Sequence, residues 1–183
     1  VDVLVNNAGV LAQGAFTALA AADHQRLVDL NVSGLTAMLS AFVPAMRQRG
    51  FGRVLNVASI AAFQPVPGLA TYAATKAFVN TFSESLRGEV ARQGVHVTLL
   101  APGPVRTHTP APEDQSIVDK MVPDFLWHNS AAVAEMSLDA LDRNKMRVVP
   151  GILSKGMSVA GGYSPRAIIA PIVGSFYRKL GDG

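Results

Sequence analysis

The sequence predicts an α/β protein in which a parallel sheet is flanked by helices. Three short apolar runs have the composition of strands buried on both faces: VDVLVNNA (residues 1–8), RVLNVAS (Arg53–Ser59) and VHVTLLAPG (Val95–Gly103). Each run is separated from the one before it by a long stretch with helical periodicity. This alternation is typical of a parallel sheet, because neighbouring parallel strands need a crossover connection.

The two intervening stretches each carry an apolar stripe at three- and four-residue steps. The first stripe consists of Leu27, Asn31, Gly34, Leu35, Met38, Phe42 and Met46, with a bend expected at Pro44. The second consists of Val79, Phe82, Leu86 and Val90, and Gly94 stands where this helix is expected to end. A helix around residues 131–141 and a fourth strand, Met146–Pro150, complete the expected sheet. Residues 104–127 are rich in proline and polar residues and are expected to form a long loop.

The composition fits one domain, residues 1–183, and excludes several classes of function. The chain is 49% hydrophobic and 16% charged, which is enough to bury a sizeable core. Its net charge is +3 and its basic residues are scattered, so we expect no nucleic-acid partner. There is no cysteine, which excludes disulfides and thiolate sites. His24 and His96 lack partners at ligand spacing, and His108 and His128 lie in or beside the expected loop, so we expect no metal.

The apolar stretches are not those of a membrane protein. The longest one near the end, AIIAPIVG, is interrupted by Pro171 and is shorter than the ~20 residues that a membrane span requires. Asp2 stands where a signal peptide would carry basic residues. We therefore expect a cytoplasmic protein without membrane contact.

The residues that are able to carry chemistry follow the expected strands, where ligands of open parallel sheets bind. Tyr72 and Lys76, in TYAATKAFVN, are four residues apart and share one helical face. An adjacent ammonium favours the phenolate, so we expect it to lower the pKa of Tyr72 toward neutrality, as a general acid/base requires. Ser59, at the neighbouring strand end, is able to donate a hydrogen bond to the same substrate oxygen.

Each of these residues also has a structural interpretation when it is taken alone. Tyr72 could be an aromatic residue at a helix start and Lys76 a surface charge, because Y-x-x-x-K arises by chance in many helices. Ser59 could be a turn or N-cap residue. Asn31 lies on an apolar stripe, where a buried amide must be hydrogen-bonded for structural reasons. The joint order and spacing of all four favour a functional site.

That order resembles the short-chain dehydrogenase/reductase (SDR) family over most of the chain. The matching motifs are N-N-A-G (Asn6–Gly9), Asn31 in NVSG, Ser59, Y-x-x-x-K (Tyr72–Lys76) and P-G-x-V-x-T (Pro102–Thr107). The resemblance implies a Rossmann-like parallel sheet with flanking helices, corresponding to the C-terminal half of an SDR domain. It also implies a C-terminal extension from about residue 151.

The resemblance further implies an oxidoreductase that uses NAD or NADP to interconvert a carbonyl and a secondary alcohol. Tyr72 would transfer the proton, Lys76 would lower its pKa and hold the nicotinamide ribose, and Ser59 would orient the substrate. Asn31 would anchor a water that links Lys76 to solvent. The implied cofactor-binding residues are Asn7, Ala8, Gly9, Tyr72, Lys76, Pro102, Gly103, Val105 and Thr107.

The glycine-rich turn that binds the pyrophosphate in this family precedes the N-N-A-G strand and has no counterpart here. The segment GILSKGMSVAGG (residues 151–162) fits neither that motif nor a P-loop. We therefore expect an N-terminally truncated SDR portion, whose preference for NAD or NADP stays open. Its first strand would form an exposed sheet edge, so we expect a homo-oligomer, formed through that strand or through the helices around Met38 and Phe82.

Two other functions remain open at this point. Without a dinucleotide site, Ser59 beside Tyr72 and Lys76 could act as the nucleophile of an ester hydrolase. Neither G-x-S-x-G nor S-x-x-K is present to support that chemistry. The chain could also be an inactive remnant, in which case mutation of these residues would change no activity.

Overall fold

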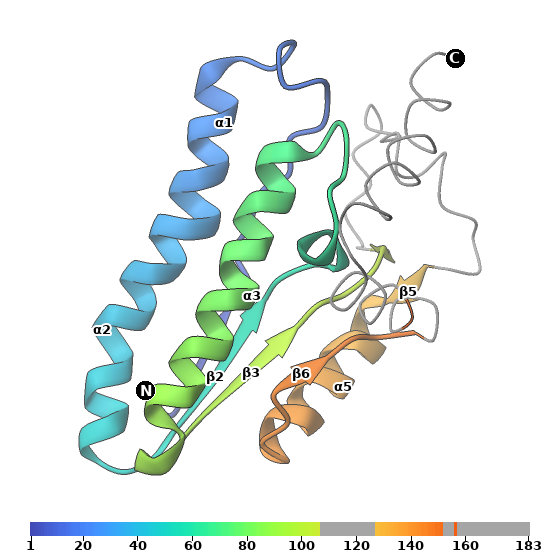
Figure 1. Ribbon diagram of the computed structural model, residues 1–183. Helices are drawn as coiled ribbons and strands as arrows, with labels where there is room; N and C mark the ends of the chain where they lie inside the picture. Colours follow the sequence, from blue (N-terminus) through green and yellow to red (C-terminus); the bar gives the residue numbers. More distant parts are fainter. Residues whose placement is uncertain (107–126, 152–155, 157–183) are drawn as a thin grey trace.

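The main sheet has four parallel strands, as the apolar runs predict. The structure is a computed structural model that describes residues 1–106, 127–151 and 156 (Figure 1). The strands are β1 (Val3–Asn6), β2 (Gly52–Val57), β3 (Val95–Leu100) and β6 (Arg147–Val148), and their order is β1-β2-β3-β6. Because the order follows the sequence, the carboxyl ends of successive strands lie side by side, and β1 forms one edge of this sheet.

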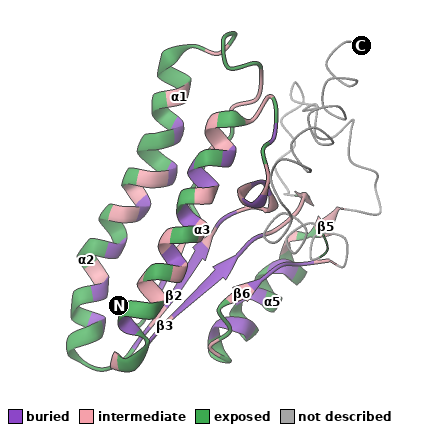
Figure 2. Cartoon of the chain, viewed as in Figure 1, coloured by how far each residue is buried: buried purple, intermediate pink, exposed green. Residues whose placement is uncertain are grey.

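Helices cover both faces of the sheet (Figure 1). On one face lie α2 (Leu35–Gln48) and α3 (Ala70–Val90), which pack on Leu4, Val54 and Val97. On the other face lies α5 (Ser130–Asp142), which packs on Leu55 and Leu100. β2 and β3 alternate between the two cores and are buried along most of their length (Figure 2), as expected for strands that are covered on both faces. The edge strand β1 is buried only at Leu4.

The first predicted helix is one continuous stretch with an irregular centre. It begins as α1 (Ala21–Val28), passes through a π-helical segment, η1 (Asp29–Gly34), and continues as α2. Pro44, where a bend was expected, lies inside α2. The change from α-helix to π-helix lies earlier, at η1, which ends ten residues before Pro44. The π-helical segment contains Asn31, and such segments frequently mark functional sites.

The same stretch, Ala21–Gln48, is the one described helix whose length and apolar composition are sufficient to cross a membrane. Core helices of globular proteins also have this length and composition. Four residues of α2, Leu35, Leu39, Val43 and Met46, are buried and belong to the core against the sheet. The packing of this helix is therefore that of a sheet-covering helix.

Gly94 ends the second predicted helix, as expected. After α3 comes one 3₁₀ turn, η3 (Ala91–Gln93), and then Gly94 with φ +75°. A Cβ atom on Gly94 would lie 2.0 Å from the carbonyl oxygen of Gly50. Both the left-handed backbone and the close approach of a second turn therefore require glycine at this position.

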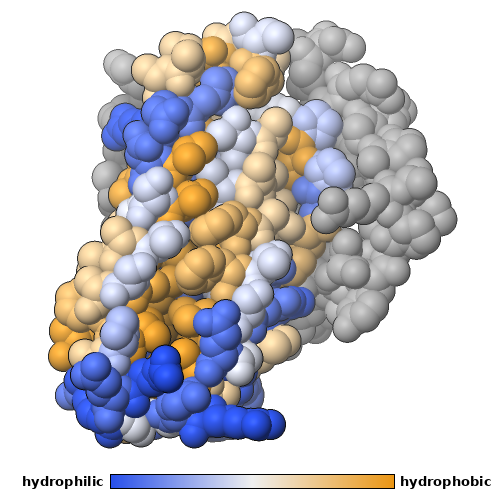
Figure 3. All heavy atoms as spheres, turned by 60° about the vertical axis from the view of Figure 1, so that its left-hand side comes forward, coloured by the Kyte–Doolittle hydropathy of each residue, from blue (hydrophilic) through white to orange (hydrophobic). Residues whose placement is uncertain are grey.

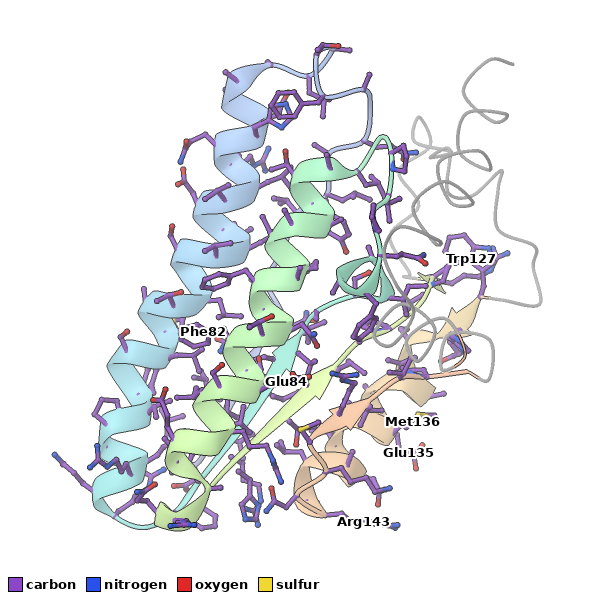
Figure 4. The ribbon with its side chains drawn as sticks, viewed as in Figure 1. Phe82, Glu84, Trp127, Glu135, Met136 and Arg143 are labelled. Carbon is purple, nitrogen blue, oxygen red and sulfur yellow. The ribbon has the colours of Figure 1, made fainter. Side chains whose placement is uncertain are left out.

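Two short strands that the sequence pattern does not predict lie at the two ends of the expected loop, one inside it and one directly after it. β4 (Val105–Arg106) and β5 (His128–Asn129) form a separate parallel pair, too short to show a periodic signal. The Arg106 guanidinium lies 5.2 Å from the centroid of the ring of Trp127, which Figure 4 labels. Residues 107–126 and most of the expected C-terminal extension lie outside the described residues.

The outer strand β6 is attached to the α3 side of the sheet by Arg147. Its guanidinium forms an ion pair with Glu84 of α3, which is labelled in Figure 4. The same guanidinium lies 4.9 Å from the ring centroid of Phe63, at the end of the 3₁₀ helix η2 (Ile60–Phe63). Charge and ring contacts thus hold this two-residue strand in place where the hydrogen bonds of the sheet are few.

Candidate active site

A cleft lies where the carboxyl ends of β1, β2 and β3 meet. Its volume is about 250 Å³, and it is lined by eight of the residues that the sequence singles out: Asn7, Gly9, Ser59, Tyr72, Lys76, Pro102, Gly103 and Val105. Ala8 and Asn31 do not line it directly, and Thr107 lies outside the described residues. A larger, more open hollow on α1, beside Arg26 and Asp29, has none of the predicted site residues. The cleft is therefore the candidate active site.

Tyr72 lies in the first turn of α3, held by packing and close to Ser59. Its ring packs beside the small core of Ala61, Val66 and Ala73. Ser59 caps η2 by accepting a hydrogen bond from the Ala61 amide at 3.2 Å, and its side chain lies near enough to the Tyr72 phenol to lower the pKa of that group. The serine and the phenol thus line the same part of the cleft, from which both could reach one substrate oxygen.

The acidity of Tyr72 differs from the sequence-based expectation. Burial of the phenol raises its pKa above the ordinary value, and the Ser59 side chain opposes part of the rise. The expected lowering of the Tyr72 pKa by Lys76 is therefore wrong for the chain by itself. The physical reason is that the desolvation of the phenolate outweighs the ammonium, whose nitrogen lies 5.8 Å from the ring centroid.

Lys76 is a buried residue rather than a surface charge. Only 6% of it is exposed, and its Nζ donates a hydrogen bond to the carbonyl oxygen of Val57 at 3.0 Å. Burial lowers its pKa from the ordinary value of 10.5 to about 8. Tyr72 and Lys76 both reach the same cleft from one face of α3, as their spacing predicts.

Asn31 joins three parts of the site through its side chain. Its amide nitrogen donates to the Val10 carbonyl at 3.0 Å and to the Thr75 hydroxyl at 3.1 Å, and its Oδ1 accepts from the Val10 amide at 3.0 Å. Thr75 in turn donates to the carbonyl of Tyr72 at 2.8 Å. Both amide hydrogens are used within the protein, so any water that Asn31 holds would have to bind elsewhere on this residue.

Thr75 and a second buried polar chain were missed by the sequence analysis. Asn6, the first residue of the N-N-A-G motif, donates to Oδ1 of Asn56 at 2.8 Å, and Asn56 donates to the hydroxyl of Ser83 at 2.9 Å. This chain joins β1, β2 and α3 beneath the cleft. The available signal was Asn56 itself, a polar residue in an otherwise apolar strand, because a buried amide requires partners.

A family model described as short chain dehydrogenase matches residues 1–117, which include the cleft residues described above. The chain belongs to the short-chain dehydrogenase family. Asn31, Ser59, Tyr72 and Lys76 all lie within the matched residues. Among the described residues, no three His, Cys, Asp or Glu side chains gather in a way that would hold a metal ion.

Two curated proteins illustrate the sequence similarity. An uncharacterized oxidoreductase of Myxococcus xanthus is 41% identical over 113 residues, which are 60% of this chain and 44% of that protein. Acetoacetyl-CoA reductase of Cupriavidus necator is 33% identical over 122 residues, which are 67% of this chain and 50% of that protein. The chain spans about half the length of these curated relatives.

A solved structure confirms the predicted Rossmann-like fold. The short-chain dehydrogenase of Sphingobium yanoikuyae in complex with NADPH matches with a TM-score of 0.75 and 28% identity. The match covers 88% of this chain and 62% of that one. The parallel sheet with flanking helices is thus the family's architecture, and its strand ends bring the family's motif residues into one cleft.

Proposed function

We propose that this SDR chain carries the catalytic portion of an oxidoreductase that uses NAD or NADP to interconvert a carbonyl and a secondary alcohol. The observation that carries the proposal is the cleft, in which Ser59, Tyr72 and Lys76 meet at the carboxyl ends of the strands. When bound, the nicotinamide would supply or accept the hydride. The protein's own task is then to bind, to orient and to move one proton.

Tyr72 is the proposed proton donor. Its raised pKa keeps the phenol protonated at neutral pH, which is the form needed to protonate the oxygen of a carbonyl undergoing reduction. Ser59, which lines the cleft beside the phenol, would hold the same substrate oxygen. Lys76 would bring a positive charge to the phenolate that forms, and Asn31 would support this arrangement through Val10 and Thr75.

The cleft walls fit the nicotinamide end of such a cofactor. Gly9 and Gly103 carry no side chains, so backbone atoms line the cleft at these two positions beside Tyr72 and Lys76. The proposed contacts are Asn7, Ala8, Gly9, Tyr72, Lys76, Pro102, Gly103 and Val105, together with Thr107. We propose a single domain, 1–183, in the cytoplasm, with an extension from about residue 151 and with a small carbonyl or alcohol as substrate.

Calorimetric titration of the purified chain with NADPH and then NADH tests this proposal. We expect saturable binding of at least one of them, and a loss of affinity of about tenfold or more in Lys76→Ala, because the ammonium would hold the ribose. Gly88→Ala, on the part of α3 away from the cleft, serves as the control and should bind as the native chain does. Failure of both nucleotides to bind would contradict the proposal for this chain.

No observation favours the ester-hydrolase alternative. An ester hydrolase would need a base that takes a proton from Ser59. Lys76 Nζ instead donates a hydrogen bond to the Val57 carbonyl. Burial raises the pKa of Tyr72 and so disfavours the phenolate, which is the form that would act as a base. Ser59→Ala separates the two functions, since it would abolish acyl transfer but leave partial reductase activity. An inactive remnant would bind neither nucleotide and would hydrolyse no ester.

We also propose that the chain forms a homo-oligomer. An apolar band runs over the helices α2 and α3 (Figure 3), where Met38 is 43% and Phe78 is 37% exposed. A second apolar surface lies on the edge strand β1, where Val3 and Val5 are each 47% exposed. Contiguous exposed apolar surface of this kind marks interfaces, and an edge strand offers unpaired backbone groups.

Light scattering on paired variants distinguishes the two surfaces. Met38→Glu/Phe78→Glu is expected to lower the mass of the particle if the helix face is the interface, because association would bury the new carboxylates. Val3→Lys/Val5→Lys is expected to do so if the β1 edge is the interface. A native chain that is monomeric at tens of micromolar concentration would refute the oligomer.

A further inference from the structure

Gly9 lies in the cleft at a position where the backbone does not require glycine. Its φ lies outside the left-handed region, unlike that of Gly14, Gly68 or Gly94. An alanine is therefore compatible with the backbone, and the reason for a glycine has to be sought in the space around it.

That space is occupied by two polar atoms of the site. A Cβ atom on Gly9 would lie 3.2 Å from Oδ1 of Asn31 and 3.3 Å from Nζ of Lys76. Both distances are shorter than ordinary van der Waals contact between a methyl group and a polar atom. The ammonium and the amide oxygen thus approach the backbone of Gly9 in the position that a side chain would take.

The two neighbours differ in how far they are able to move away. Asn31 is 2% exposed and is fixed by hydrogen bonds to both backbone groups of Val10 and to Thr75. Lys76 has a flexible stem, and among the described residues its ammonium donates one hydrogen bond, to the Val57 carbonyl. A methyl group on residue 9 would therefore displace the ammonium rather than the amide.

We propose that Gly9 is a positioning residue, whose missing side chain admits the Lys76 ammonium to its place against the Val57 carbonyl. A side chain at residue 9 pushes the ammonium toward the open part of the cleft and into contact with water. This placement of Lys76 does not depend on a bound cofactor. Its consequence for cofactor binding rests on the proposed function.

The chain offers a matched control for this substitution. Gly88 lies inside α3, also without left-handed φ, and a Cβ atom there would meet no atom within 4 Å. Gly88→Ala therefore adds the same methyl group without a new contact. The two variants differ in whether the methyl group meets Lys76 and Asn31.

Acetylation of Lys76 as a function of pH, followed by mass spectrometry of the full chain, tests the placement directly. The native midpoint is expected at about 8, because the amine is buried. In Gly9→Ala the midpoint is expected to rise by about one unit, because a hydrated ammonium regains its ordinary acidity. In Gly88→Ala it is expected to stay at the native value. A midpoint in Gly9→Ala that is unchanged or lower would overturn the proposal.

A second measurement covers the case in which Gly9→Ala folds poorly. The stability lost on Gly9→Ala should be smaller in a Lys76→Ala background, where the displaced group is gone, than in the native chain. An equal loss in both backgrounds would show that Lys76 is not the group displaced, and would overturn the proposal by itself. Urea denaturation monitored by circular dichroism gives all four stabilities.

Failure of this proposal is distinguishable from failure of the proposed function. If the native chain binds NADPH or NADH, Gly9→Ala should weaken that binding about tenfold, while Gly88→Ala leaves it intact. If the native chain binds neither nucleotide, the proposed function fails, but the acetylation midpoints still decide where Lys76 lies. If Gly9→Ala binds the nucleotides as tightly as the native chain does, and its Lys76 acetylation midpoint equals the native one, only the positioning role is wrong.

Discussion

Replacement of Tyr72 by phenylalanine is expected to lower kcat/KM for carbonyl reduction by about 10³-fold, because it removes the proposed proton donor. The variant keeps the ring that packs beside Ala61, Val66 and Ala73, so the fold should persist. NADPH consumption with a panel of small aliphatic and aromatic ketones as probe substrates gives the rate. Retention of more than about a tenth of native activity would contradict the role of Tyr72.

A matched control removes a buried hydroxyl that lies outside the cleft, on the sheet. Thr98 is fully buried on β3, does not line the cleft, and donates to the Lys145 carbonyl at 2.7 Å. Thr98→Val is therefore expected to cost some stability, about 1 kcal/mol, with little change in kcat/KM. A comparable loss of activity in both variants would mean that the Tyr72→Phe effect is structural.

The pH dependence of the reduction rate is a second, independent test of the role of Tyr72. Reduction needs the protonated phenol, and burial raises the pKa of Tyr72 above its ordinary value. The rate contributed by this group should therefore be level through neutral pH and fall only in the alkaline range, as the phenol loses its proton. If the reduction rate of the native chain instead fell with rising pH already below pH 7, and this fall were absent in Tyr72→Phe, the raised pKa of Tyr72 would be contradicted.

Replacement of Lys76 by methionine is expected to stabilise the chain at pH 7, although the same change should impair activity. Burial lowers the pKa of Lys76 from 10.5 in an exposed amine to about 8 in the fold. At pH 7 the folded chain therefore holds a desolvated ammonium, at a cost of roughly 3 kcal/mol relative to an exposed one. Methionine removes that cost and keeps the apolar stem, but it loses the hydrogen bond to Val57, which contributes about 1 kcal/mol. The expected net gain is about 2 kcal/mol.

The sign of the pH dependence follows from the same pKa difference. Between about pH 8 and 10.5 the native state loses the Lys76 proton before the unfolded state does, so the unfolded state binds more protons. The contribution of this group to the free energy of unfolding therefore rises with pH through that window. Below pH 8 both states carry the proton, and the contribution stays at its lowest value.

Urea denaturation at pH 7 and pH 10 measures both effects. Lys145→Met, which removes an exposed amine, is the control and should change the pH dependence little. The native chain should gain stability relative to Lys76→Met as the pH rises from 7 to 10. A Lys76→Met chain that is less stable than the native one at pH 7 would refute the buried-ammonium interpretation.

The order of strands, helices and motif residues was predictable from the sequence, because each depends on local composition and spacing. Short apolar runs separated by helical stretches predicted β1, β2, β3 and β6 correctly. The four-residue spacing of Tyr72 and Lys76 also placed both on one face of α3. The pairs Val105–Arg106 and His128–Asn129 were not predicted, since two-residue strands leave no periodic pattern.

The properties of the site depended on packing that no local pattern records. The pKa of Tyr72 rises rather than falls because the fold buries the phenol more strongly than the ammonium stabilises its anion. Thr75 and Asn31 form one hydrogen-bonded unit although they are 44 residues apart in the chain. The motif residues and the family therefore follow from the sequence alone. The protonation states of Tyr72 and Lys76, and the space that Gly9 leaves for the ammonium, were decided only by the tertiary structure, because desolvation and close contact arise between segments that are distant in sequence.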